Sequence, residues 1–141
     1  MSVTINLWLL KVAAWLGQWK FVDTFIGEAI NPVGIGWAKE EGLFKKNANL
    51  RDLAASILEK ESSERRFDEV TERNLLIRAR EDPSEAVRFR AICALWTHGR
   101  NNRDDPFVWP RMQRFAQSGD EGIVKVAREY LAKADEKQST A

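Results

Sequence analysis

The chain has 141 residues, of which 44% are apolar and 30% are charged. Its 22 Lys and Arg residues stand against 21 Asp and Glu residues, so the formal net charge is +1. The apolar fraction excludes a disordered chain, and the balanced charge argues against a protein built mainly to coat nucleic acid. One cysteine excludes an internal disulfide and a cysteine zinc site, so we expect a reducing, cytoplasmic compartment.

The first predicted element is an apolar helix that holds three of the six tryptophans. Lys11 and later polar residues interrupt the apolar run before about 18 clean residues accumulate, so we expect no membrane span. No basic residue precedes the run, and we expect no signal peptide. Trp8, Trp15 and Trp19 share a narrow arc, as an interfacial anchor requires, but polar residues scatter around the helix. This scatter favours burial in the fold or in a homo-oligomer interface, with residues 1–31 forming N-terminal capping helices.

One helical pattern recurs three times after the turn-rich stretch 31–36. Each copy has an aliphatic residue, an alanine four positions later and a leucine four positions after that. The first positions of the copies are spaced by 37 and 36 residues. Such a stripe is one face of a helix, and a fixed period of this size is typical of stacked helical repeats. The copies are Leu50-Ala54-Leu58, Val87-Ala91-Leu95 and Ile123-Ala127-Leu131.

Residues typical of helix starts support the same register. A further helical stretch precedes each copy, at residues 36–44, about 64–81 and about 106–117. No run alternates with period two, so we expect essentially no sheet. The candidate caps are Asp82 followed by Pro83 and Glu85, Ser118 with Glu121, Asn47 or Asn49, and Asp105 before Pro106.

The stretch Asp82–Leu95 resembles the turn and second helix of a HEAT repeat, whose pattern has Asp in the turn, then Val-Arg, then Ala and Leu. The copy at 49–58 is similar with Asn for Asp, and the copy at 121–131 has Val124 in place of the arginine. The resemblance covers roughly residues 32–134. In this family the turn Asp and the following Arg pair between neighbouring repeats, which implies structural roles for Arg51 and Arg88.

The resemblance implies an all-α fold, a short right-handed α-solenoid of about three helix-turn-helix repeats with an extra apolar N-terminal helix. First helices would line its convex side and second helices its concave side. We expect one domain over residues 1–134 and a polar, frayed tail at 135–141. The expected repeats span residues 32–60, 64–99 and 105–134.

Residues typical of catalysis are scarce. His98 is the only histidine, and it lies at an expected helix C-terminus where it would cap carbonyls. Cys93 lies in the middle of a helix without a basic partner, and Gly34 with Gly36 lacks the third glycine of a nucleotide loop. No His, Cys or carboxylate set has metal-ligand spacing. We therefore expect that the chain is not an enzyme and that it has no catalytic residue, metal or cofactor.

The second helices differ on the face opposite the repeated stripe. The first copy presents Asp52, Ser56 and Glu59 there and the third presents Lys125, Glu129 and Ala132, whereas the middle copy presents apolar residues. Aromatic residues beside arginine are typical of interface hot spots. The alternative is that the N-terminal helix or the 100–105 loop covers this stripe. The predicted partner-binding residues are Phe89, Arg90, Cys93, Trp96 and Arg100.

These observations favour a non-enzymatic interaction or scaffold module that binds a protein partner through its concave face. The alternative is nucleic-acid binding through segment 73–114, which holds nine arginines against five acids. Some HEAT-like proteins, DNA glycosylases among them, hold DNA in a concave basic groove. A third hypothesis is self-association through the N-terminal apolar helix, because solenoid ends normally carry polar faces.

Overall fold

The structure is a computed structural model that describes residues 6–61 and 66–139, with side chains up to residue 137. Over these ranges the chain forms eight α-helices and no strand, which confirms the expected all-α class. Two short 3-10 turns, η1 (Ile26–Ala29) and η2 (Gly42–Phe44), flank α3. The helices are α1 (Leu7–Trp15), α2 (Trp19–Phe25), α3 (Pro32–Glu40), α4 (Ala48–Lys60), α5 (Glu69–Glu81), α6 (Glu85–Thr97), α7 (Val108–Phe115) and α8 (Glu121–Ser139).

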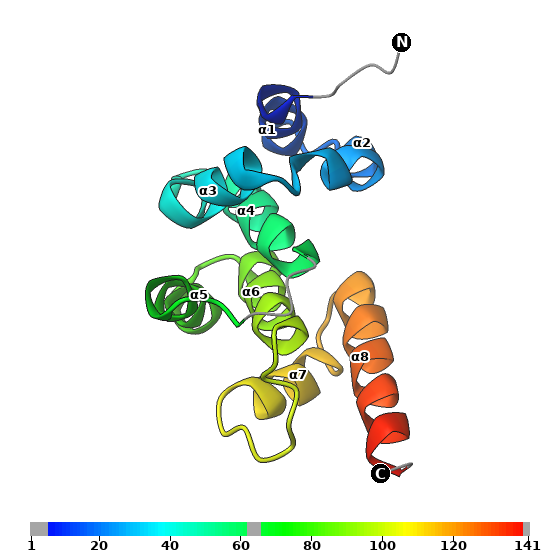
Figure 1. The fold of residues 1–141 in the computed structure, drawn as a ribbon. Helices are drawn as coiled ribbons and strands as arrows, with labels where there is room; N and C mark the ends of the chain where they lie inside the picture. Colours follow the sequence, from blue (N-terminus) through cyan, green and yellow to red (C-terminus); the bar gives the residue numbers. More distant parts are fainter. Residues whose placement is uncertain (1–5, 62–65, 140–141) are drawn as a thin grey trace.

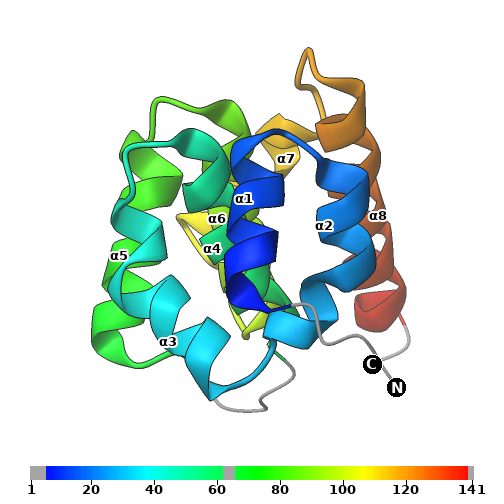
Figure 2. The ribbon, with the colours of Figure 1, turned by 90° about the horizontal axis from the view of Figure 1, so that it is seen from above.

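The helices lie in layers around the pair α4 and α6, which pack side by side at the centre of the molecule (Figure 1). Helix α3 packs on α4 and α5 packs on α6, and both lie on the same side of the central pair. On the other side lie α2 and α8, as both views show (Figure 2). Helix α7 contacts α6 and α8, and α1 contacts α2 and α4. The central pair is thus covered by helices from both ends of the chain.

The repeated stripe forms much of the core, as its period predicts. Its middle alanines and most of its aliphatic residues are buried, while Leu50 and Leu131 are half-buried. The alanines let neighbouring helices approach closely, and the leucines fill the space between them. The fully buried members are Ala54, Leu58, Val87, Ala91 and Ala127.

The helix starts agree with the expected register, although α6 and α8 use a cap other than the expected one. Asn47 caps α4 by accepting from the N–H of Leu50 at 3.1 Å, as expected. Ser84, and not Asp82, caps α6 through the N–H of Val87 at 3.3 Å. Asp120 caps α8 where Ser118 was expected, because its carboxylate accepts from the N–H of Ile123 at 3.1 Å.

The stretch 31–36 is the start of a helix, which corrects its interpretation as a turn. Asn31 accepts from the N–H of Gly34 at 2.9 Å, and Pro32 occupies the first helical position, where its missing N–H costs nothing. Gly34 is required for packing, because a Cβ there would lie 1.9 Å from the carbonyl oxygen of Ala29. The glycine therefore allows α3 to pack closely against η1.

The expected frayed tail at 135–141 is also wrong over most of its length. Helix α8 continues to Ser139, and the last two residues lie outside the described ranges. Residues 123–139 hold no Gly or Pro, so nothing in their chemistry stops the helix at residue 134.

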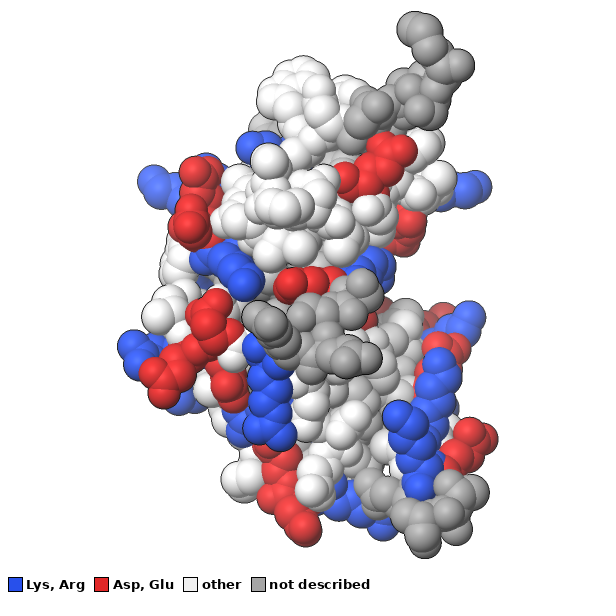
Figure 3. All heavy atoms as spheres, viewed as in Figure 1, with Lys and Arg blue, Asp and Glu red and all other residues white. Residues whose placement is uncertain are grey.

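The N-terminal helices are buried on one side only. Leu10, Ala13 and Ala14 of α1 face the core, whereas Trp8 is 63% exposed and Trp15 59% exposed. The surface over α1, at the top of Figure 3, is formed almost wholly by uncharged residues.

None of the described helices is long and apolar enough to cross a membrane.

A buried ion pair links consecutive helical pairs. Arg51 of α4 donates to both carboxylate oxygens of Asp82, from Nε at 2.7 Å and from Nη2 at 3.0 Å. Asp82 precedes α6 and is 2% exposed. This contact confirms the structural role expected for Arg51. Arg88 does not repeat it, because its guanidinium donates to the backbone oxygen of Asp82 at 2.6 Å.

We predict that Asp82→Ala lowers the free energy of unfolding by about 3–5 kcal/mol, because it leaves the Arg51 guanidinium buried without an ionic partner. Urea denaturation at pH 7 measures this loss. The control is Glu81→Ala, which removes an exposed pair with Arg80 and changes stability by at most about 1 kcal/mol. Equal losses in the two variants would contradict the prediction.

The same pair predicts a pH dependence. Burial raises the pKa of Asp82, but hydrogen bonds from Arg51 and the N–H of Ser84 outweigh it and hold the pKa below the ordinary value of 3.8. A carboxylate with a lowered folded-state pKa stabilises the fold above its unfolded-state pKa. Wild-type stability is therefore lost as pH falls below about 4, and Asp82→Ala loses less over that window.

Candidate partner-binding groove

The structure buries most of the stripe that was expected to face a partner. Phe89, Cys93 and Trp96 are each at most 4% exposed. The prediction that they form an exposed face is therefore wrong. The covering elements are α7 and α8, and not the N-terminal helix or the 100–105 loop that the alternative named.

Aromatic contacts show how the two helices cover α6. Phe89 meets Phe115 of α7 edge to face, with ring centroids 5.1 Å apart. Trp96 stacks on Trp109 of α7 at 4.9 Å and meets Tyr130 of α8 at 6.0 Å. Stacked and edge-to-face aromatic pairs stabilise a core beyond the area that they bury. The aromatic residues of α6 thus hold α7 and α8 in place.

Cys93 is a packing residue in this arrangement. It is fully buried on α6, and burial raises the pKa of its thiol well above the ordinary value. The thiol is therefore protonated at neutral pH and has no nucleophilic character. Cys93 cannot contact a partner at the surface of this chain.

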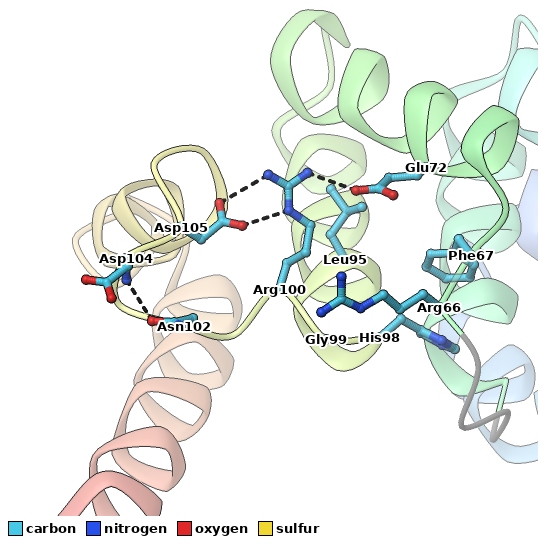
Figure 4. A pocket seen from close by; sticks show the side chains of 10 residues that line it. All are labelled: Arg66, Phe67, Glu72, Leu95, His98, Gly99, Arg100, Asn102, Asp104 and Asp105. Carbon is cyan, nitrogen blue, oxygen red and sulfur yellow. Dashed lines mark hydrogen bonds and ion pairs between the residues drawn. The ribbon is translucent and has the colours of Figure 1, made fainter.

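Arg100 also has a structural position, between the loop after α6 and helix α5 (Figure 4). Its guanidinium pairs with Asp105, Nε to Oδ2 at 2.7 Å, and with Glu72 of α5, Nη1 to Oε1 at 3.1 Å. Asp105 in turn accepts from the N–H of Val108, the first residue of α7, at 2.7 Å, but the N-cap position is Phe107 and not Asp105 as expected. Burial raises the pKa of Asp105, but the Arg100 and backbone hydrogen bonds outweigh it and lower the pKa. Arg100 therefore fixes the loop.

A pocket of about 330 Å³ lies beside this ion pair (Figure 4). His98 forms part of its wall, and its ring stacks on Phe67 with centroids 4.1 Å apart. Among the described residues, neither ring nitrogen of His98 has a hydrogen-bond partner, so the ring does not cap the carbonyls of α6 as the sequence suggested. The wall carries Arg66 and Arg100 against three carboxylates, which leaves no excess of positive charge.

A larger groove of about 600 Å³ lies over α4 and α6, between α2 and α8. It opens at the hollow between α2 and α8 on the right of Figure 3. Four helices therefore contribute to its walls: α2, α4, α6 and the first turns of α8. The charged and aromatic residues used below are Trp19, Asp23, Asp52, Lys60, Arg90 and Asp120.

Glu59 joins three helices beside this groove. Its Oε2 accepts from Nη1 of Arg90 at 3.0 Å, and its Oε1 accepts from the hydroxyl of Tyr130 at 2.5 Å. Nε of Arg90 is buried and makes no hydrogen bond with any residue that the structure describes. It lies 3.5 Å from Oδ1 of Asp52, so this contact is ionic. Burial disfavours the charge of Arg90, but Glu59 and Asp52 raise its pKa above the ordinary value. Arg90, predicted as a partner contact, is thus a charged part of the groove already paired within the chain.

Asp52 is the acid of the groove whose charge is disfavoured by burial. Its pKa lies above the ordinary 3.8, because the effect of burial exceeds the opposite effects of Arg90 and of the Ser56 hydroxyl. Its side chain is 13% exposed. A carboxylate with a raised pKa gains from an additional cation.

The remaining charges of the groove also favour a cation. Asp23 of α2 and Asp120 at the start of α8 also line the groove. Of its two lining cations, Arg90 pairs with Glu59 and the other is Lys60. Trp19 is half-buried and supplies an aromatic wall. A positively charged group therefore fits the groove better than a negatively charged one.

Four residues of this arrangement were not predicted from the sequence as parts of a site: Trp19, Glu59, Asp120 and Tyr130. Glu59 belonged to the polar face of the first copy, which looked like a solvated surface. The only tyrosine, Tyr130, was a weak signal of a polar contact in the interior, since the hydroxyl of a buried tyrosine usually needs a hydrogen-bond partner. Its contact with a residue 71 positions away depends on the placement of α8.

Comparisons with protein-family models, with curated proteins and with solved structures found no match to this chain. In the ranges that the structure describes, no three His, Cys, Asp or Glu side chains come together as metal ligands would. The groove is therefore interpreted from its own residues.

We predict that Tyr130→Phe lowers the free energy of unfolding by about 1.5 kcal/mol, because Glu59 loses a hydrogen bond to its charged oxygen. Chemical denaturation measures the loss, with Glu129→Gln on the exposed side of α8 as the control. A double-mutant cycle with Glu59→Gln isolates the pair. Additive effects of the two substitutions would show that the hydroxyl and the carboxylate are not coupled.

Proposed function

We propose that this chain is a non-enzymatic protein-interaction module that binds a lysine or arginine side chain of a protein partner in the groove between α2 and α8. The observation that carries the proposal is Asp52, a carboxylate kept in the groove although burial raises its pKa. Ionisable groups with shifted pKa values, and residues that lower the stability of the fold, are concentrated at functional sites. Asp52 is thus placed to receive a cation from outside the chain.

The surroundings of Asp52 support a partner of this chemistry. Asp23 and Asp120 lie on opposite walls, so an entering cation meets carboxylates from α2, α4 and α8. The methylene groups of a lysine or arginine would lie against Trp19, which favours an extended cationic side chain over a simple ion.

We also propose that the pairs α3/α4, α5/α6 and α7/α8 are three HEAT-like repeats. The spacing of the stripe and the Arg51–Asp82 contact between consecutive pairs support this interpretation. The groove then lies on the second-helix side, where the sequence placed the concave face. Its acids disfavour a nucleic-acid backbone there, so the alternative function finds no support in this groove.

The groove proposal predicts a selective loss on Asp52→Asn. The probes are two fluorescent peptides that differ only by one central residue, arginine or citrulline. We expect the wild-type chain to prefer the arginine peptide and Asp52→Asn to bind it about tenfold less tightly, because a charge-assisted pair is removed. The matched control is Asp104→Asn, an acid of the α6–α7 loop outside the groove. Equal binding of the two peptides, or no effect of Asp52→Asn, would contradict the proposal.

Stability separates this loss from misfolding. A folded-state pKa above the unfolded value means that Asp52 stabilises the fold at low pH, and that this contribution declines as pH rises above about 4. Asp52→Asn is therefore expected to be as stable as the wild type at pH 7, or more so, by urea denaturation. A clear loss of stability would show that Asp52 serves the fold.

The exposed apolar side of α1 supports self-association with a second copy of the chain as a separate proposal. Trp8 and Trp15 together with Leu16, which is 58% exposed, leave apolar surface of the kind that marks protein interfaces. We expect a dimer by light scattering at micromolar concentration, and a monomer for the double variant Trp8→Ser and Trp15→Ser. A monomeric wild-type mass would exclude this dimer.

A further inference from the structure

Four arginines meet at the corner formed by the end of α5, the start of α6 and α7. They surround a pocket of about 250 Å³, which we call the arginine pocket. One acid, Glu85, shares its wall, so the lining groups leave three positive charges in excess. Glu85 also accepts a hydrogen bond from the hydroxyl of Ser118 at 3.1 Å. The arginines are Arg80, Arg88, Arg111 and Arg114.

Other arginines of segment 73–114 are compensated by acids. Arg78 pairs with Asp82, Arg90 with Asp52 and Glu59, Arg100 with Glu72 and Asp105, and Arg103 with Asp135. In the arginine pocket, Arg80 pairs with Glu81 at the exposed rim, at 3.3 Å. Within the described residues, Arg88, Arg111 and Arg114 form no ion pair. Arg73, exposed on α5, forms none there either, but the other three surround one pocket.

Two of these arginines are held in position by neutral groups. Nη1 of Arg88 donates to the backbone oxygen of Asp82 at 2.6 Å. Nη1 of Arg111 donates to the backbone oxygen of Phe107 at 3.1 Å, and its guanidinium lies 3.7 Å from the centroid of the Phe107 ring. A carbonyl or a ring orients a guanidinium without neutralising it, so each keeps its charge and further N–H donors for a ligand.

Mutual repulsion in the pocket supports the same view. Burial lowers the pKa of Arg111, and the nearby charges of Arg114 and Arg80 lower it further. An anion placed among these groups would remove the repulsion. The pocket therefore carries excess positive charge, and its Arg88, Arg111 and Arg114 have no ion-pair partner among the described residues.

We propose that the arginine pocket binds a compact, multivalent oxyanion of the phosphate class. Guanidinium groups bind phosphate oxygens in a planar, two-bond geometry, and several of them together are the usual means of binding phosphate groups. A diphosphate carries enough negative charge to compensate three arginines, whereas a single carboxylate does not. The proposal does not depend on the groove, which lies between α2 and α8 and has the opposite preference.

The geometry favours a small ligand over a nucleic acid. A nucleic-acid backbone is bound by cations spread along a track, with several phosphate contacts. Here the uncompensated arginines surround one pocket of about 250 Å³, the size of a single phosphate or diphosphate group with its water.

The test is calorimetric titration of the chain with inorganic pyrophosphate at constant ionic strength. We expect saturable binding, and about tenfold weaker binding for the double variant Arg111→Gln and Arg114→Gln. The matched control is Arg73→Gln with Arg128→Gln, which makes the same change in net charge at exposed arginines outside the pocket. This control is expected to bind pyrophosphate as the wild type does. Arg114→Gln alone, a change at an exposed side chain, repeats the test with the least risk to folding.

Further arms distinguish the sources of phosphate. Sulfate, with two charges, is expected to bind more weakly than pyrophosphate, and a single-stranded oligonucleotide is expected not to exceed pyrophosphate in affinity. Absence of pyrophosphate binding would overturn the proposal. Equal losses in the pocket and control variants would also overturn it, because binding would then reflect overall charge. Tight oligonucleotide binding that depends on the same arginines would replace the small oxyanion with nucleic acid.

Discussion

The Glu59 carboxylate is the contact on which the shape of the groove depends. One of its oxygens binds Arg90 of α6 and the other binds the hydroxyl of Tyr130 of α8, while Glu59 itself belongs to α4. Helix α8 packs mainly against α7. Its place beside the central pair therefore relies on long side chains that reach across to α4 and α6. A polar link of this kind keeps two helices together without closing the space between them. The groove is therefore a consequence of how α8 is held.

Two buried aspartates show how differently the fold treats the same side chain. Asp82 has two close donors on Arg51 and the N–H of Ser84, and its pKa is lowered. Asp52 has one ionic contact at 3.5 Å and a hydroxyl at 3.3 Å, too little to offset burial, and its pKa is raised. The first arrangement is complete within the chain and contributes to stability. The second leaves room for a cation, which is why position 52 is interpreted as part of a site.

Local chemistry was enough to predict the helices but not the packing of α8. Asn47 caps the helix that it was expected to cap, and Asp105 accepts from the N–H of Val108 at the start of α7, because such contacts depend on a few neighbouring residues. The face of Phe89 and Trp96 looked exposed because two further helices were expected to stack in the manner of the first pairs. Instead, α7 and α8 cover that face with Phe115, Trp109 and Tyr130. Contacts between residues so distant in sequence leave no periodic signal along the chain.

The net charge of the arginine-rich segment 73–114 was also a poor guide to the charge of its surface. Nine arginines against five acids predicted a basic surface, yet the partners of several of them lie outside the segment, as Glu59 does for Arg90 and Glu72 for Arg100. Counting charges along the chain could not show which arginines these distant acids neutralise. The packing of α5, α6 and α7 places Arg88, Arg111 and Arg114, which no acid among the described residues neutralises, around one pocket. What remains is a site for one compact anion, a narrower chemistry than nucleic-acid binding along the whole segment.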